Sequence, residues 1–105
     1  MIVVVGRVRT DADKRAAMIE IGQTVARASR AEAGCIGYRL YEDTETPDDF
    51  VFVEEWQDDA ALQEHFRTPH IAAFMASILD AIVGAPDVRF HEVASTRDLS
   101  NVTAG

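Results

Sequence analysis

Hydrophobic residues recur with a period of two in four segments of the chain, a pattern typical of β-strands. These strands are predicted at residues 2–9, 35–42, 50–56 and 87–94. Because successive side chains of a strand point to opposite faces, the second strand is expected to place three large side chains on one face, namely Ile36, Tyr38 and Leu40. By the same rule, the third strand groups Phe50, Phe52, Glu54 and Trp56.

Between the first two strands the hydrophobic period changes to three and four residues, which indicates an amphipathic helix. Thr10 or Asp11 is expected to cap its N-terminus, because a short polar side chain can accept a hydrogen bond from a free backbone N–H group. The helix should run for about 20 residues, with Gly34 as its C-terminal cap. An acidic turn that contains Pro47 then joins the second and third strands as a hairpin.

Two helices are predicted between the third and fourth strands. Asp58 or Asp59 should cap the first of them, which is short. Thr68 followed by Pro69 predicts the start of the second, because Thr caps backbone N–H groups and Pro has no N–H to lose at the first helical position. The apolar residues of this helix recur at helical spacing, and it is expected to end near Gly84.

The predicted order of elements is therefore β-α-β-β-α-β, with the second helical segment interrupted at Thr68. This order predicts a ferredoxin-like α+β fold, in which helices cover one face of a four-stranded antiparallel sheet. Residues 1–95 are expected to form the domain, and residues 96–105 a polar C-terminal tail. The face without helices would carry Val3, Val5, Val51 and Val53. An uncovered apolar face predicts a homodimer joined through the sheets.

Composition narrows the classes of partner. The chain has 105 residues, 48% of them hydrophobic, as expected of a globular domain. Its 18 acidic and 10 basic residues give a formal charge of -8, which disfavours nucleic acid or an anionic membrane surface as a partner. Apolar runs fall short of the roughly 18 residues that a membrane span needs. Cys35 is the single cysteine, which fits a reducing compartment, so we expect a cytoplasmic protein.

His65 is the first candidate for acid–base chemistry, because the pKa of imidazole lies near neutrality. It shares the apolar stripe of its helix with Leu62 and Phe66, so its side chain is expected to face the sheet. A buried histidine satisfied by one hydrogen bond is an equal alternative. His70 lies in the first turn of the next helix, a place more typical of a surface or capping residue.

The third strand carries the other candidates. Trp56 could form the wall of an aromatic pocket with Phe52, or fill a small core. Glu54 shares their face, where a carboxylate must be ion-paired, exposed at the strand end or functional. Arg39 and Arg7 are candidate partners for it. Tyr38 is an ordinary strand aromatic unless a pocket opens beside it.

The sequence offers little for a cofactor or a metal. The glycines form neither a dinucleotide fingerprint nor a phosphate-binding loop. His65 and His70 are five residues apart across a predicted helix break, and His91 lies on another strand, which is not a usual ligand spacing. We therefore expect neither a cofactor nor a metal.

Four short segments, taken together, resemble the antibiotic biosynthesis monooxygenase (ABM) domain family. They are residues 33–38, 53–58, 61–65 and 68–70. The resemblance covers about residues 1–95 and rests on the joint order and spacing of these segments. It implies a dimeric α+β barrel built from two ferredoxin-like subunits.

What the resemblance implies for function is a cofactor-free monooxygenase that converts an aromatic phenol or hydroquinone to a quinone with dioxygen. In such an enzyme a base deprotonates the phenol, and an apolar pocket keeps water from the intermediate. His65 would be the base or an orienting residue. The expected substrate-binding residues are Trp56, Phe52, Tyr38, Glu54, Arg39 and His70. Haem degradation is not expected, because Gly6 and Arg7 stand where that branch of the family has an asparagine.

Two other classes of function stay open at this point. The chain could be a non-catalytic module for small-molecule binding or dimerisation. It could also be a non-oxidative isomerase or lyase of the same fold that uses His65 as a proton shuttle. Dioxygen dependence separates the oxygenase from the isomerase, and turnover of any kind separates both enzymes from the binding module.

Overall fold

The computed structural model describes residues 1–103 and contains the predicted four-stranded antiparallel sheet. The strands are β1 (Ile2–Arg9), β2 (Cys35–Glu42), β3 (Asp49–Trp56) and β4 (Asp87–Glu92). They lie in the order β2-β3-β1-β4, and each neighbouring pair is antiparallel. The ferredoxin-like arrangement expected from the sequence is thereby confirmed.

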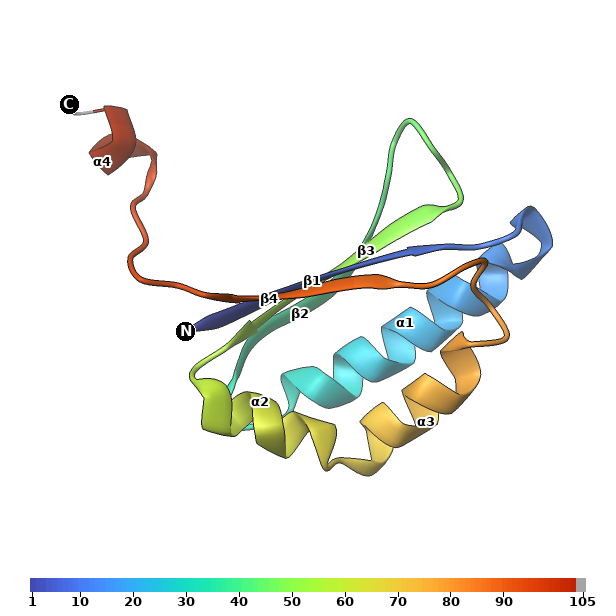
Figure 1. Ribbon diagram of the computed structural model, residues 1–105, viewed down its shortest axis with the longest axis horizontal. Helices are drawn as coiled ribbons and strands as arrows, with labels where there is room; N and C mark the ends of the chain where they lie inside the picture. The colour runs from blue at the N-terminus through green and yellow to red at the C-terminus, as the bar shows by residue number, and fades with distance from the viewer. Residues whose placement is uncertain (104–105) are drawn as a thin grey trace.

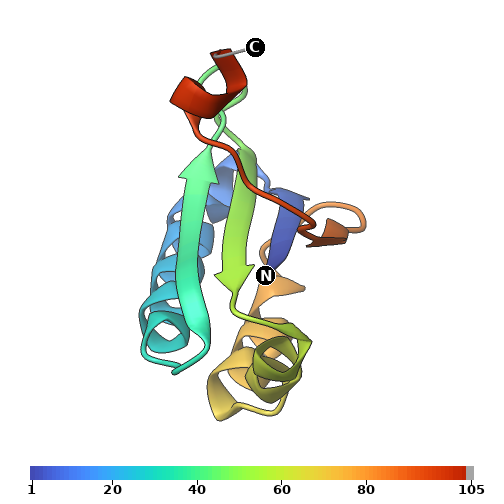
Figure 2. The ribbon, with the colours of Figure 1, turned by 90° about the vertical axis from the view of Figure 1, so that its left-hand side faces the viewer.

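The helices form one layer against one face of this sheet (Figures 1 and 2). They are α1 (Arg15–Arg30), preceded by the single 3-10 turn η1 (Ala12–Lys14), then α2 (Asp59–Phe66) and α3 (Pro69–Ile78). The side chain of Asp58 accepts a hydrogen bond from the backbone N–H of Ala61, and that of Thr68 accepts one from Ile71. Both predicted caps are therefore confirmed, and Pro69 occupies the first position of α3.

The core lies between the helical layer and the strands β1, β2 and β3. Its most deeply buried large side chains are Met18 of α1, Tyr38 of β2 and Trp56 of β3. Gly22 of α1 faces Leu40, and a Cβ atom at position 22 would lie 2.3 Å from the Leu40 side chain. The glycine therefore lets α1 pack directly against the sheet.

The second strand differs from the prediction at its start. Cys35 pairs with Trp56, but the next paired residue is Gly37, so a bulge leaves Ile36 without a partner. The bulge shifts by one residue the alternation of β2 side chains between the two faces of the sheet. Ile36 is consequently 58% exposed instead of sharing the buried face of Tyr38, and Cys35 packs against the core in its place.

Three predicted helix ends also need correction. Asp11 holds the N-cap position of η1 without a side-chain hydrogen bond. The first helix ends at Arg30, and Gly34 is not its cap: a Cβ atom there would lie 2.2 Å from the Cβ of Ala61, so glycine is needed for close approach to α2. The last helix of the layer, α3, ends at Ile78 and does not reach Gly84. Gly84 has a positive φ of 74°, a conformation that favours glycine.

Beyond β4 the chain leaves the sheet and carries a short helix, α4 (Leu99–Thr103), away from the helical layer (Figure 1). The predicted tail over residues 96–105 thus contains one helical turn, and residues 104–105 lie outside the described part of the chain. Among residues 1–103, we find no helix long and apolar enough to cross a membrane.

Candidate functional site

An apolar cavity of about 340 Å³ lies between the helix-facing side of the sheet and α3. The sheet contributes Phe52, Val88 and Phe90, and the helical layer contributes Phe74 and Ile78. The cavity exists because the helices cover β1, β2 and β3 but leave β4 exposed, so Val88 and Phe90 are about half exposed. Three titratable side chains complete the wall: Tyr38, Glu54 and His65.

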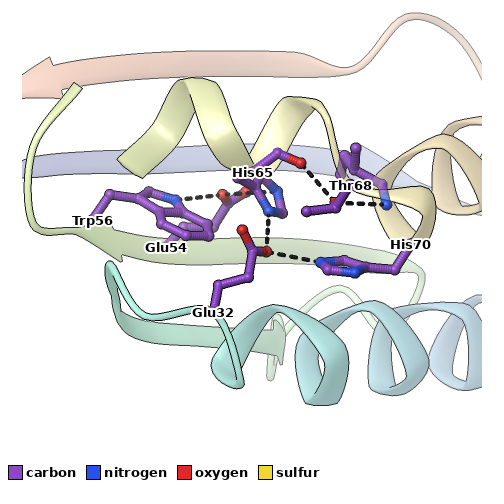
Figure 3. A network of polar contacts seen from close by, with 7 residues as sticks. Glu32, Glu54, Trp56, His65, Thr68 and His70 are labelled. Atoms are coloured by element: carbon purple, nitrogen blue, oxygen red, sulfur yellow. Dashed lines mark hydrogen bonds and ion pairs between the residues drawn. The ribbon is translucent and has the colours of Figure 1, made fainter. Parts of the chain in front are cut away.

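His65 reaches the cavity from α2. Its side chain is only 1% exposed, and its ring packs on the indole of Trp56 with 4.4 Å between ring centroids. The Nδ1 atom lies 2.7 Å from Oε2 of Glu32. This contact is drawn as a dashed line in Figure 3. Burial lowers the pKa of His65 below its ordinary value, and Glu32 opposes that shift. The imidazole is therefore neutral at neutral pH and available as a base.

Glu54 approaches His65 from β3. Its Oε1 atom accepts a hydrogen bond of 3.0 Å from the indole N–H of Trp56, and it lies 3.9 Å from Nε2 of His65 (Figure 3). Burial raises the pKa of Glu54 to about 7, while hydrogen bonds from Trp56 and Tyr38 work against the rise. A carboxyl group that titrates near neutrality thus stands next to a neutral imidazole.

Tyr38 closes the same end of the cavity from β2. Its ring is almost fully buried and meets Phe52 edge-on at 6.2 Å between centroids. Burial, followed by the negative charge of Glu54, raises the pKa of the Tyr38 hydroxyl. The hydroxyl is therefore protonated across the physiological range and can donate a hydrogen bond to a ligand or to Glu54.

Glu32 joins the two histidines that the sequence placed on separate helices. It follows α1, and its Oε2 atom lies 2.7 Å from Nδ1 of His65 and 2.8 Å from Nε2 of His70. Sequence reasoning missed Glu32, because it lies in a connecting segment where no hydrophobic period applies. Its only sequence signal is its place beside residues 33–38, a segment of the family resemblance.

This trio is also the group of residues that could hold a metal, since its ligand atoms all lie within 4.8 Å of one another. Tetrahedral zinc with bonds of about 2.1 Å keeps its ligand atoms roughly 3.4 Å apart. The Glu32 oxygen is closer than that to both ring nitrogens. The distances are those of hydrogen bonds.

The structure places the remaining predicted site residues differently. Trp56 is fully buried behind His65 and is not part of the cavity wall, whereas Phe52 is. His70 does not line the cavity; it contacts Glu32 at 2.8 Å, and its ring lies 5.9 Å from that of His65 between centroids. Neither Arg39 nor Arg7 is a partner of Glu54: they lie opposite Val53 and Val51 and project from the other face of the sheet. The roles of these residues in substrate binding stay predictions.

Comparison with known proteins adds an independent line of evidence. The sequence profile of the family described as "Antibiotic biosynthesis monooxygenase" matches residues 1–77. The chain is 36% identical over 98 residues to the uncharacterized protein sll1783 of Synechocystis, covering 93% of this chain and 67% of that protein. It is 32% identical over 88 residues to "Putative monooxygenase YcnE" of Bacillus subtilis, covering 84% of this chain and 93% of that protein.

A more distant relative carries a more specific name. The chain is 27% identical over 88 residues to "Probable quinol monooxygenase YgiN" of Escherichia coli, covering 74% of this chain and 85% of that protein. Among solved structures, that of Rv0793 from Mycobacterium tuberculosis superposes with a TM-score of 0.86 at 25% identity. The superposition covers 92% of this chain and 98% of that one.

Proposed function

Because the chain belongs to the antibiotic biosynthesis monooxygenase family, we propose that it is a monooxygenase that oxidises an aromatic phenol or hydroquinone to a quinone with dioxygen. The observation that carries this proposal is the placement of His65 beside Glu54, with 3.9 Å between Nε2 and Oε1, at one end of an otherwise apolar cavity. Such a cavity, with few convergent polar groups of shifted pKa, is the usual form of a small-molecule site. The names of two relatives include the word monooxygenase, and one of them specifies a quinol.

The electron balance of this reaction needs no external reductant. A phenol with a free ring position plus one dioxygen gives a quinone plus one water, and a hydroquinone plus one dioxygen gives a hydroxyquinone plus one water. In both cases one oxygen atom of dioxygen is bonded to a ring carbon, the other leaves as water, and the substrate supplies all the electrons. We therefore propose that flavin, haem and metal take no part.

His65 would begin the reaction as a general base. Its Nε2 atom takes the hydroxyl proton, and the electron pair stays on the phenolate oxygen, which makes the ring electron-rich enough to react with dioxygen. Glu54 and Tyr38 lie where they can orient that oxygen by hydrogen bonds. The aromatic walls, Phe52 and Phe74, meet edge-on at 5.3 Å and would hold the flat ring and exclude water.

Oxygen uptake by metal-stripped protein over a panel of hydroquinones and polycyclic phenols tests this function. We expect wild-type uptake above the autoxidation blank and a fall of about 100-fold or more in His65→Gln. His91→Gln is the matched control, because His91 lies on exposed β4 outside the cavity. Uptake equal to the blank on every substrate would overturn the oxygenase proposal, and equal rates in both variants would remove His65 from it.

The proximity of Glu54 and His65 also favours one second function. Two adjacent groups whose pKa values are shifted in opposite directions can move a proton between two positions of a carbonyl substrate. The protein would then be an isomerase that needs no dioxygen. Deuterium exchange into a cyclic ketone, dependent on His65 under anaerobic conditions, would favour this function over oxygenation.

We also propose that two copies associate through the sheet face that carries no helices. Val3, Val5, Val51 and Val53 are only partly covered in the single chain. Arg7, Arg39 and Glu55 lie around them on the same face and could pair across a two-fold axis. Analytical ultracentrifugation should give about twice the chain mass of 11.6 kDa. A single species of one chain mass at micromolar concentration would contradict the dimer.

A further inference from the structure

Glu32 contacts Nδ1 of His65 and does not line the cavity, whereas Glu54, which lies nearer Nε2, does line it. We propose that Glu32, itself held by His70, is a positioning residue that keeps the proton of His65 on Nδ1 and leaves Nε2 free to accept a proton from the substrate. This inference rests on the proposed role of His65 as a base. It assigns Glu32 and His70 a task in the reaction although neither lines the cavity.

The two ring nitrogens of His65 have unequal partners. Nδ1 lies 2.7 Å from Glu32 Oε2, a short hydrogen bond, whereas Nε2 lies 3.9 Å from Glu54 Oε1, beyond hydrogen-bond distance. An ionised carboxylate can only accept, so the nitrogen that contacts Glu32 must carry the hydrogen. In a neutral imidazole the other nitrogen is then an acceptor. The hydrogen-bond geometry therefore selects the tautomer in which the free nitrogen lies toward Glu54 and the cavity.

His70 fixes the position of Glu32. Its Nε2 atom lies 2.8 Å from the same carboxylate oxygen that Nδ1 of His65 contacts, so a second N–H group can donate to Glu32. The His70 side chain is 23% exposed, and it links this buried pair to the surface beside α1. With two donors on one oxygen, Glu32 has little freedom to rotate away from His65.

The break between α2 and α3 is what places the two histidines around one carboxylate. The Thr68 hydroxyl donates to the carbonyl of His65 at 2.7 Å and accepts from the backbone N–H of Ile71. It thus ties the end of one helix to the start of the next (Figure 3). On a continuous helix, residues 65 and 70 would point in directions about 140° apart.

Glu32 would also act after the proton has moved. When Nε2 takes the substrate proton, His65 becomes an imidazolium in surroundings that disfavour charge. The carboxylate at 2.7 Å then makes a charge-assisted hydrogen bond, which is stronger than the bond to the neutral ring. No proton needs to pass to Glu32. Its charge lowers the free energy of the protonated base, as in other carboxylate–histidine pairs.

The position of the hydrogen can be measured without any substrate. Nitrogen-15 NMR of histidine-labelled protein at about pH 8, where the ring is neutral, reports which ring nitrogen is protonated, and His65→Gln identifies the signal. We expect the Nδ1–H tautomer in the wild type and a mixture in Glu32→Gln, whose amide can donate as well as accept. Glu64→Gln, an exposed change on the same helix as His65, should leave the signal unchanged. An Nε2–H tautomer in the wild type would overturn the inference.

Kinetics give the second test. Glu32→Gln should lower kcat by about 100-fold or more with little change in KM, because the base has the wrong tautomer and its charged form is not stabilised. His70→Gln should lower it by about tenfold, and Glu32→Asp should retain part of the rate. Full activity in Glu32→Gln would contradict the inference. If no variant or wild type consumes dioxygen, the function proposed above fails while the NMR result still decides the tautomer.

Zinc titration in the same NMR experiment examines the alternative use of this trio. Binding of one equivalent at micromolar concentration, with loss of the Nδ1–H signal of His65 and perturbation of His70, would identify a metal site and overturn the positioning role. We expect the tautomer to persist in the presence of equimolar zinc, since the three ligand atoms are spaced for hydrogen bonds.

Discussion

The two faces of the sheet are built from the same alternating strands, yet they differ in what their polar residues do. Glu54 and Glu55 are neighbours on β3. The side chain of Glu54 lies under the helical layer, is 12% exposed and contacts Trp56 and His65. Glu55 projects from the opposite face among valines, where no helix covers it. The covered face therefore holds the carboxylate of Glu54 close to a base, whereas the open face leaves that of Glu55 at the surface.

This comparison shows that the covering layer, more than the strand sequence, determines the chemistry. Burial raises the pKa of Glu54 and lowers that of His65, and both shifts depend on the helices above them. Where the helices stop, at β4, the apolar side chains Val88 and Phe90 become the wall of a cavity instead of part of the core. Because the helices cover the sheet incompletely, a cavity remains that can hold a ligand.

The largest difference between the faces should be in stability. Trp56→Ala removes a fully buried indole from the covered face and should lower the free energy of unfolding by about 3–5 kcal/mol. Val53→Ala on the open face should cost about 1 kcal/mol or less at concentrations where the chain is monomeric. Urea unfolding followed by circular dichroism measures both. Equal losses would mean that the open face is as tightly packed as the core.

A pH-dependent difference should separate the two glutamates. The folded state holds the pKa of Glu54 at about 7 against an ordinary value of 4.5, so it binds more protons than the unfolded chain between these values. The contribution of Glu54 to the free energy of unfolding is fully present below pH 4.5. It is lost as the pH rises through 7, a decrease of about 3 kcal/mol. Glu54→Gln should abolish that fall, and Glu55→Gln should retain it. Parallel stability curves for both variants from pH 4.5 to 8 would contradict the assignment.

The smallest expected effect concerns the helix break above the covered face. Thr68→Ala removes the hydroxyl that caps α3 and contacts the His65 carbonyl, and should cost about 1 kcal/mol. Thr68→Ser keeps the hydroxyl and should retain most of that stability. Hydrogen exchange of the α3 amide groups would show where the loss occurs, and an unchanged exchange rate in Thr68→Ala would argue against a capping role.

The hydrophobic periods were sufficient to predict the four strands and the helices between them, and the caps at Asp58 and Thr68 followed from local chemistry. The bulge at Ile36 was not predictable, because pairing with β3 decides which residue of β2 is skipped. The C-terminal end of α1 could not be predicted, because Gly34 serves a packing contact with Ala61, which lies 27 positions away in sequence.

Only part of the site could be predicted from the sequence. His65 and Glu54 could be chosen by residue type and by the face they share with apolar neighbours. Glu32 could not, because a carboxylate in a connection has no pattern to set it apart from the other acidic residues. The cavity itself exists because α3 stops short of β4, which is a property of packing and not of either segment alone.

The exposure of β4 bears on how fast a ligand can exchange. Val88 and Phe90 belong to the cavity wall and are also 46% and 52% exposed, so the wall is open to solvent along this strand. We expect a ligand to enter the cavity along this exposed strand without displacement of a helix. Ligand association should therefore be rapid and limited only by diffusion to the cavity. In enzymes with a lid, by contrast, opening of the lid can limit turnover.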